Sequence, residues 1–208
     1  MTDYKTVSKS GVDEFVEKRS RFIGYCEPVT TQAQALEFIE KIKSKHWDAK
    51  HNVYAYILRE GGIKRYSDDG EPQGTAGVPV LEVMQKMGIT DAVVVVTRYF
   101  GGILLGAGGL VRAYSHGAKI AVESACPAIM QLCDNCTLKC SYNQYGRVSS
   151  VVLSGGGVVL DSAFTDQVEM KFRVKKGCLD KINKELAAAS SGEVEAASID
   201  ESYYLQEI

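Results

Sequence analysis

A glycine-rich segment between residues 98 and 112 has the composition of an anion-binding loop. Arg98 begins it, Arg112 ends it, and the residues between include Gly101, Gly102, Gly106, Gly108 and Gly109. A loop of this kind that leads into a helix exposes backbone N–H groups at the positive helix end, where a phosphate binds well. The two arginines suit bidentate contacts with the same anion, and Tyr99 and Phe100 suit stacking on a base.

The same segment differs from the common nucleotide-binding loops. It lacks the lysine of a P-loop, and Glu123, the acidic residue about 20 positions further on, falls within a helix and not at the end of a second strand. A structural role is the alternative, in which the glycines let the helix pack closely against a sheet. Anion or nucleic-acid binding and close packing both remain open.

A second segment, residues 67–77, combines carboxylates with turn-forming residues. Asp68, Asp69 and Glu71 lie within four positions of each other, which would suit Mg²⁺ binding or activation of a water molecule. Acidic loops of this composition are also typical solvated turns or helix caps, and the next helix is expected to begin near Gly74 and Thr75. We expect three side chains to flank this loop: His51, Lys64 and Arg65. They either touch a ligand or are simply solvated.

The cysteines predict free thiols and no metal centre. One CxxC pair, Cys133 and Cys136, precedes a third thiol at Cys140, but this region is expected to be extended. On a strand, Cys136 and Cys140 would lie roughly 13 Å apart, too far to share one ion. We therefore expect half-buried thiols, no resident metal and no cofactor, with Mg²⁺ considered only for an enzymatic role of the acidic loop.

Composition places the chain among ordinary globular proteins. It has 208 residues, 45% hydrophobic and 24% charged, with a formal net charge of −2, which excludes disorder, coiled coil and a histone-like basic protein. Residues 1–126 hold 16 basic and 15 acidic residues, and residues 127–208 hold 8 and 11, so neither half is a basic module. The first residues form no apolar signal segment, and no stretch is apolar enough to span a membrane. We expect a cytoplasmic protein with no membrane partner.

Hydrophobic periodicity predicts the elements that position these residues in the first half of the chain. We expect one or two strands over 13–29, a helix after Thr31, a strand over 53–58, a helix near 80–87 and a buried central strand over 92–96. The clearest helix runs from Leu110 to Ala125, directly after the glycine-rich segment.

The second half restarts after Pro127, which breaks the chain. The pattern predicts a strand over 137–142, a helix near 144–153, strands over 158–164 and 168–174, a helix over 179–186 and a last strand near 198–205. This βαββαβ order is the ferredoxin-like pattern. Lys171 and Arg173 are expected to face outward from their strand, on a face suited to protein or RNA contact. The fold class is α+β, with one domain over 1–130 and a second over 131–208, meeting near 127–135.

Two stretches closely resemble the signature of the IMPACT/YigZ family: Tyr66–Gly77 and Val95–Tyr114. Ser20–Gly24 and Ala49–Tyr56 look like flanking motifs of the same family. The resemblance covers about residues 19–125. It implies a first domain similar to domain 2 of ribosomal protein S5 and a ferredoxin-like second domain similar to a domain of elongation factor G. Eukaryotic members regulate translation by protein binding, and the resemblance implies no catalytic residue.

These observations lead to one main hypothesis and two alternatives. The main hypothesis is a non-enzymatic cytosolic protein, linked to translation or stress regulation, that binds RNA or the ribosome through the residues of the glycine-rich segment, with Lys64 and Arg65 assisting. One alternative is a Mg²⁺-assisted phosphohydrolase or phosphotransferase, in which the glycine-rich segment holds phosphate and Asp68, Asp69 or Glu71 holds Mg²⁺. The other is a protein-interaction module in which Tyr99 and Phe100 anchor a protein partner.

Overall fold

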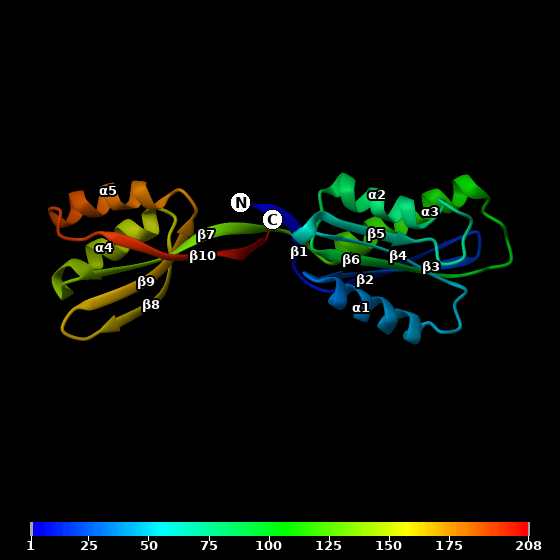
Figure 1. Ribbon diagram of the computed structural model, residues 1–208, viewed down its shortest axis with the longest axis horizontal. Helices are drawn as coiled ribbons and strands as arrows, with labels where there is room; N and C mark the ends of the chain where they lie inside the picture. Colours follow the sequence, from blue (N-terminus) through cyan, green and yellow to red (C-terminus); the bar gives the residue numbers. More distant parts are fainter. Residues whose placement is uncertain (1, 208) are drawn as a thin grey trace. The chain divides into compact units, whose positions relative to one another are not determined.

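The computed structural model describes residues 2–207, which divide into two compact units (Figure 1). One unit comprises Tyr4–Ile129 together with the chain from Leu205 onward, and the other comprises residues up to Asp3 and Met130–Tyr204. The described residues form five α-helices and two five-stranded sheets. None of the helices in residues 2–207 combines the length and apolar character needed to cross a bilayer.

The unit that contains the glycine-rich segment is built on an antiparallel sheet with the strand order β2-β3-β6-β4-β5. Its strands are β2 (Gly11–Glu17), β3 (Ser20–Pro28), β4 (His51–Leu58), β5 (Ile63–Ser67) and β6 (Ala92–Tyr99). The apolar, β-branched run over 92–96 is the central strand, as predicted, and it is buried on both faces. Strand β5 was not predicted, because Lys64, Arg65 and Tyr66 are exposed and form no apolar face.

Helices cover both faces of this sheet (Figure 1). Helix α1 (Gln32–Lys45) packs on one face, over a core that includes Ile23, Val93 and Val95. Helices α2 (Gly77–Met87) and α3 (Ala107–Ser124) pack on the other, over Phe22, Val94 and Val96. Successive side chains of a strand point to opposite faces, so β6 contributes to both cores in alternation.

Helix α3 lies unusually close to the sheet because its inner face carries small residues. A Cβ on Gly24 of β3 would collide with the carbonyl oxygen of Gly117 in α3, and one on Gly117 would lie 2.9 Å from a methyl carbon of Val96. This close packing fixes the position of α3 relative to the ends of β3 and β6. The glycine-rich segment that joins β6 to α3 is held between these two elements.

The other unit has the predicted βαββαβ order. Strand β7 (Pro127–Cys140) is followed by α4 (Tyr142–Ser154), β8 (Val158–Phe164), β9 (Val168–Lys175), α5 (Leu179–Ser190) and β10 (Ala196–Glu207). The order across its sheet is β7-β9-β8, with β10 also pairing β7. Strand β1 (Tyr4–Val7) belongs to the first unit. In β9 the side chains of Val168, Met170, Phe172 and Val174 are buried and those between them are not, as the alternation predicts.

Two boundaries in this unit were predicted wrongly. Strand β7 begins at Pro127, ten residues before the expected strand, since Pro is tolerated as the first residue of a strand and the partners of β7 are distant in sequence. Residues 127–135 are therefore strand and not an irregular junction. Helix α4 begins at Tyr142, because Ser141 and Gln144 form a capping box that the sequence analysis overlooked.

Candidate functional site

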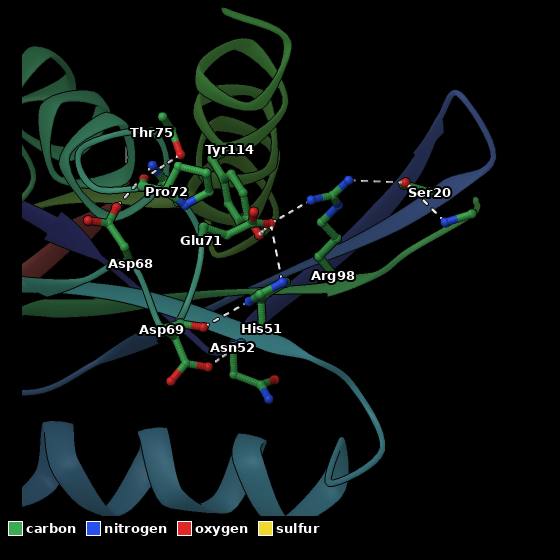
Figure 2. Close-up of polar contacts among 12 residues, drawn as sticks. Ser20, His51, Asn52, Asp68, Asp69, Glu71, Pro72, Thr75, Arg98 and Tyr114 are labelled. Carbon is green, nitrogen blue, oxygen red and sulfur yellow. Dashed lines mark hydrogen bonds and ion pairs between the residues drawn. The ribbon is translucent and has the colours of Figure 1, made fainter. Parts of the chain in front are cut away.

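The centre of the site is the carboxylate of Glu71, which joins the acidic loop to the sheet and to α3. Its Oε1 accepts hydrogen bonds from Arg98 Nη1 at 2.6 Å and from the Tyr114 hydroxyl at 2.7 Å, and His51 Nε2 lies 3.9 Å away. Figure 2 shows these side chains converging from three different elements. Burial raises the pKa of Tyr114, and the neighbouring Glu71 carboxylate raises it further, so the Tyr114 hydroxyl keeps its proton and donates a hydrogen bond to Glu71.

Arg98 is buried and serves as the counter-ion of Glu71. Its side chain is only 6% exposed, and its guanidinium carbon lies 5.5 Å from the ring centroid of Phe22 and 5.4 Å from that of Phe100. Nη2 lies 3.5 Å from Ser20 Oγ, and Nε has no hydrogen-bond partner among the described residues. The sequence analysis expected Arg98 to contact a bound anion. The structure differs, because Glu71 already occupies this arginine in the interior.

The acidic loop is stabilised by its own carboxylates, which point to separate partners. Asp68 accepts hydrogen bonds from the backbone N–H groups of Gly74, Ala76 and Gly77, at the beginning of α2. The helix begins at Gly77, between the expected start near Gly74 and the expected helical range 80–87. Thr75 donates to the carbonyl of Pro72 at 2.6 Å.

The neighbouring carboxylate, Asp69, has a different set of partners. It accepts a hydrogen bond from the backbone N–H of Asn52 at 2.6 Å, and Lys43 Nζ lies 3.5 Å from it. Its backbone carbonyl lies 2.9 Å from His51 Nδ1. Across residues 2–207, no three His, Cys, Asp or Glu side chains are grouped so as to hold a metal ion. The loop thus has the geometry of a structural turn that locks β4, β6, α2 and α3 together.

Tyr99 also differs from the expected stacking residue, because it is half-buried within a hydrogen-bond chain. Its hydroxyl donates to Asp48 at 2.8 Å and lies 2.9 Å from His46 Nδ1, while His46 Nε2 lies 2.7 Å from the Tyr25 hydroxyl. Burial lowers the pKa of His46, with Lys45 adding to the effect. A neutral His46 protonated on Nδ1 satisfies the whole chain. Of the two aromatic residues, only Phe100 is exposed.

The glycines of the segment serve different purposes. At Gly101 a Cβ would collide with the backbone carbonyl of Arg19, so this glycine permits close packing. Gly106 has φ 74° and ψ 165°, a conformation almost restricted to glycine. Gly102 also has a positive φ, and Gly109 packs against Leu105. Gly108 lies in the first turn of α3 facing open space. Close packing therefore explains Gly101, whereas Gly106–Gly108 is exposed, and anion binding stays a prediction.

The N-terminus of α3 opens on solvent without a side-chain cap. Gly106 is the N-cap residue, and Gly106, Ala107 and Gly108 are exposed. The first N–H groups of a helix have no acceptor within the helix, and they carry the positive end of its dipole. The preceding loop exposes apolar side chains as well, with Leu104 82% exposed.

Next to this helix end lies a concavity of about 470 Å³, here named the α3 concavity. Its basic side chains are Lys18, from the β2–β3 hairpin, and Arg112, from α3, and its acidic one is Glu17. The remaining lining residues are Phe15, Val16, Leu105, Gly109, Ala113 and His116. Arg112 is exposed, and its contact with an anion stays a prediction.

Lys64 and Arg65 do not reach this site. The register of the β4–β5 pair places Lys64 opposite Ile57 and Arg65 opposite Tyr56. His51 is at the other end of β4, five or six residues away, which corresponds to about 16–20 Å along a strand. The two residues are exposed on the strand that leads directly into the acidic loop, and their role beside this loop stays a prediction.

Three contributors to the site were missed or misinterpreted in the sequence. The polar role of Tyr114 was missed, although a buried tyrosine hydroxyl usually needs a partner. Ser20 was quoted only within a flanking motif, yet its Oγ accepts a hydrogen bond from the Gly101 N–H at 3.2 Å. Lys18 carries no local signal, since the hairpin between β2 and β3 alone brings it to α3.

The cysteines are free thiols, as expected, although four of the six are buried and not half-buried: Cys26, Cys133, Cys136 and Cys140. Burial raises the pKa of Cys136 to about 11, which keeps this thiol protonated and unreactive at neutral pH.

Comparisons with known proteins match two stretches of this chain to two protein domains. Residues 18–122 match the Impact N-terminal domain, and residues 138–193 match a domain of unknown function, DUF1949. The chain is 39% identical to the IMPACT family member YvyE of Bacillus subtilis over 174 residues, covering 83% of this chain and 80% of that protein. It is 31% identical to the IMPACT family member YigZ of Escherichia coli over 187 residues, 88% of this chain and 92% of that protein.

Eukaryotic relatives match a shorter part of this chain. Protein IMPACT-A of Xenopus tropicalis is 36% identical over 112 residues, which is 47% of this chain and 35% of that protein. Among solved structures, a crystal structure of a hypothetical protein superposes with a TM-score of 0.61 and 28% identity, covering 96% of this chain and 98% of that one.

Proposed function

The chain belongs to the IMPACT family, and from that premise we propose that it is a non-enzymatic cytosolic protein, linked to translation or stress regulation, that binds RNA, including RNA in the ribosome. The contact surface is the exposed end of the glycine-rich segment, the N-terminus of α3 and the α3 concavity. RNA backbone phosphates are the groups that this surface recognises.

One observation carries the proposal: the uncapped N-terminus of an 18-residue helix opens beside a concavity that contains Arg112 and Lys18. Free N–H groups, a positive helix end and an exposed arginine favour an anion. A near-neutral net charge of −2 limits the contact to a few phosphates on a local surface.

The acidic loop supports a binding role over an enzymatic one. Asp68, Asp69 and Glu71 are each engaged by the protein itself, through backbone N–H groups, Lys43 or Arg98. A carboxylate that binds catalytic Mg²⁺ or activates water must instead face the substrate. The motif stabilises the fold around the surface that binds.

The domain assignments belong to the same proposal. The sheet order β10-β7-β9-β8 with the helices between supports a ferredoxin-like domain over 131–208, similar to a domain of elongation factor G. Residues 1–130 are proposed to form a domain similar to domain 2 of ribosomal protein S5. Both similarities point toward proteins that work on RNA.

The test is the salt dependence of RNA binding by the full-length chain and by Arg112→Ala. For single-stranded RNA, log K should fall against log salt with a slope of about −0.7 per phosphate neutralised, and Arg112→Ala should remove about one such contribution. Fluorescence anisotropy with a labelled RNA measures the salt slope of the unchanged chain and of the variant. Arg65→Ala is the matched control, because Arg65 is exposed in the same unit but lies far along β4–β5. Equal effects of the two variants, or no RNA binding at low salt, would refute the proposal.

A further inference from the structure

Three basic side chains form a ridge along the outer face of α3. Arg112, His116 and Lys119 are spaced by four and three residues, so they lie on one side of the helix, and all three are exposed. The opposite side is buried through Leu110, Tyr114 and Ala121 among others. We name Arg112, His116 and Lys119 the α3 ridge. The ridge begins one turn after the uncapped helix end, so Arg112 and Lys119 extend the positive charge along the helix.

A depression lies on each side of the α3 ridge. One is the α3 concavity, where the His116 ring meets the Phe15 ring edge-to-face at 4.5 Å. The other has a volume of about 330 Å³ and lies between α2 and α3, lined by Val83, Lys86, Met87, Ser115, His116 and Lys119. His116 lines both depressions, so the α3 ridge separates them.

The charges around the ridge favour an anionic ligand. Lys18 borders one depression and Lys86 the other. The acidic neighbours are Glu17, in the α3 concavity, and Glu82 and Glu123, which pair with Lys86 and Lys119 at 3.7 Å on the exposed helix surfaces. Exposed ion pairs of this kind contribute little to stability, so a phosphate can displace these carboxylates at a small cost in free energy.

We infer that the ligand of this surface is single-stranded RNA, with its phosphates along the α3 ridge and its bases in the two flanking depressions. The inference rests on the proposed function and names the class of RNA. Unpaired bases can turn away from the backbone and enter apolar or aromatic pockets, whereas the bases of a duplex are stacked inside it. A partner helix would need one continuous apolar groove, but here a basic ridge divides the surface.

The experiment compares a labelled single-stranded RNA of about ten nucleotides with the duplex it forms with its complement. The full-length chain is titrated with each, over a range of salt concentrations. We expect the single strand to bind at least about tenfold more tightly, since only it can place bases in the depressions. Lys119→Ala should reduce the salt slope by about 0.7, as removal of one phosphate contact does. Lys41→Ala is the control, an exposed lysine of α1 on the other face of the sheet.

A second variant separates base contacts from phosphate contacts. Met87→Ala should weaken binding of the single strand and leave the salt slope unchanged, because Met87 is uncharged and lines only the depression between α2 and α3. If this variant does not fold, the ratio of single-strand to duplex affinity of the unchanged chain still tests whether bases enter the depressions. An acidic amphipathic peptide serves as a third ligand, measured under the same conditions.

The possible outcomes distinguish this inference from the proposed function. Equal binding of single strand and duplex, both weakened by Arg112→Ala, would overturn the inference and leave the proposed function standing. Binding that Lys119→Ala leaves unchanged would also overturn the inference alone. Binding of the acidic peptide without binding of either RNA would overturn both, and assign the surface to a protein partner.

Discussion

At the scale of single residues, several side chains of the most distinctive sequence motifs are buried or bonded within the protein. Glu71, Arg98 and Tyr114 form a buried network, and Asp68 caps the backbone that leads into α2. A buried ion pair contributes little net stability, yet removing one partner is costly because it leaves the other charge uncompensated. The function of these residues is therefore to hold the glycine-rich segment and the helix end in place.

The first prediction concerns this network. Glu71→Gln keeps the shape of the side chain but leaves the buried Arg98 charge uncompensated, and we expect it to lower the free energy of unfolding by about 3–5 kcal/mol. The control is Glu14→Gln, which breaks the exposed pair with Arg21, where both side chains are 51% exposed, and should cost about 0–1 kcal/mol. Urea unfolding measures both. Similar losses in the two variants would contradict the structural role of Glu71.

At the scale of elements, the junction between β6 and α3 decides what the chain presents to a ligand. Gly101 lets the segment pass close to the β2–β3 hairpin, and Gly106 adopts the conformation that begins the helix without a side-chain cap. The junction holds the first turn of α3 beside Lys18 and Arg112. Glycines in one motif thus have separate physical roles.

The second prediction separates two of these glycines. Gly106→Ala imposes a strained backbone and should lower the free energy of unfolding by about 1–3 kcal/mol. It should also weaken RNA binding, because the N-terminal end of α3 shifts. Gly108→Ala is the matched control, since its Cβ would meet only Arg112 Nη1 at 3.9 Å. Ala is the better helix former, so Gly108→Ala should stabilise by up to about 1 kcal/mol. Thermal and urea unfolding report both changes, and a destabilised Gly108→Ala would contradict this assignment.

At the scale of the whole molecule, the chain has separate hydrophobic cores in its two units. The first unit has one core on each face of its sheet, and the second unit has its own core, which includes Met170, Phe172 and Leu186. The surface proposed for RNA lies entirely in the first unit.

The third prediction follows from these separate cores. Phe172→Ala should destabilise the second unit by about 3–5 kcal/mol, and hydrogen exchange should rise across Met130–Tyr204. The amide protons of strands β3, β4 and β6 should keep their protection from hydrogen exchange. RNA binding should be unchanged. Hydrogen exchange measured by mass spectrometry resolves the two units. Ile39→Ala, in the core beneath α1, is the reciprocal control, and a rise in exchange throughout the chain in both variants would show a single cooperative unit.

Much of the fold follows from local patterns in the sequence. The β-branched run over 92–96, the small and apolar face of α3 and the alternation in 168–174 each predict an element that the structure contains. These patterns succeed because helices and strands must bury one face each with a fixed period. Elements without such a face, such as β5 and the first half of β7, were missed.

The sequence by itself determined most of the elements, the glycine-rich junction and family membership, because each depends on residues that are neighbours along the chain. Only the tertiary structure decided which charged residues are available. Arg98 and Arg112 look equivalent in the sequence, but Glu71, 27 residues before Arg98, neutralises the first of them in the interior. The second remains at the surface beside Lys18, which the β2–β3 hairpin brings to α3. Burial and pairing depend on contacts between distant segments, and local periodicity carries no information about these.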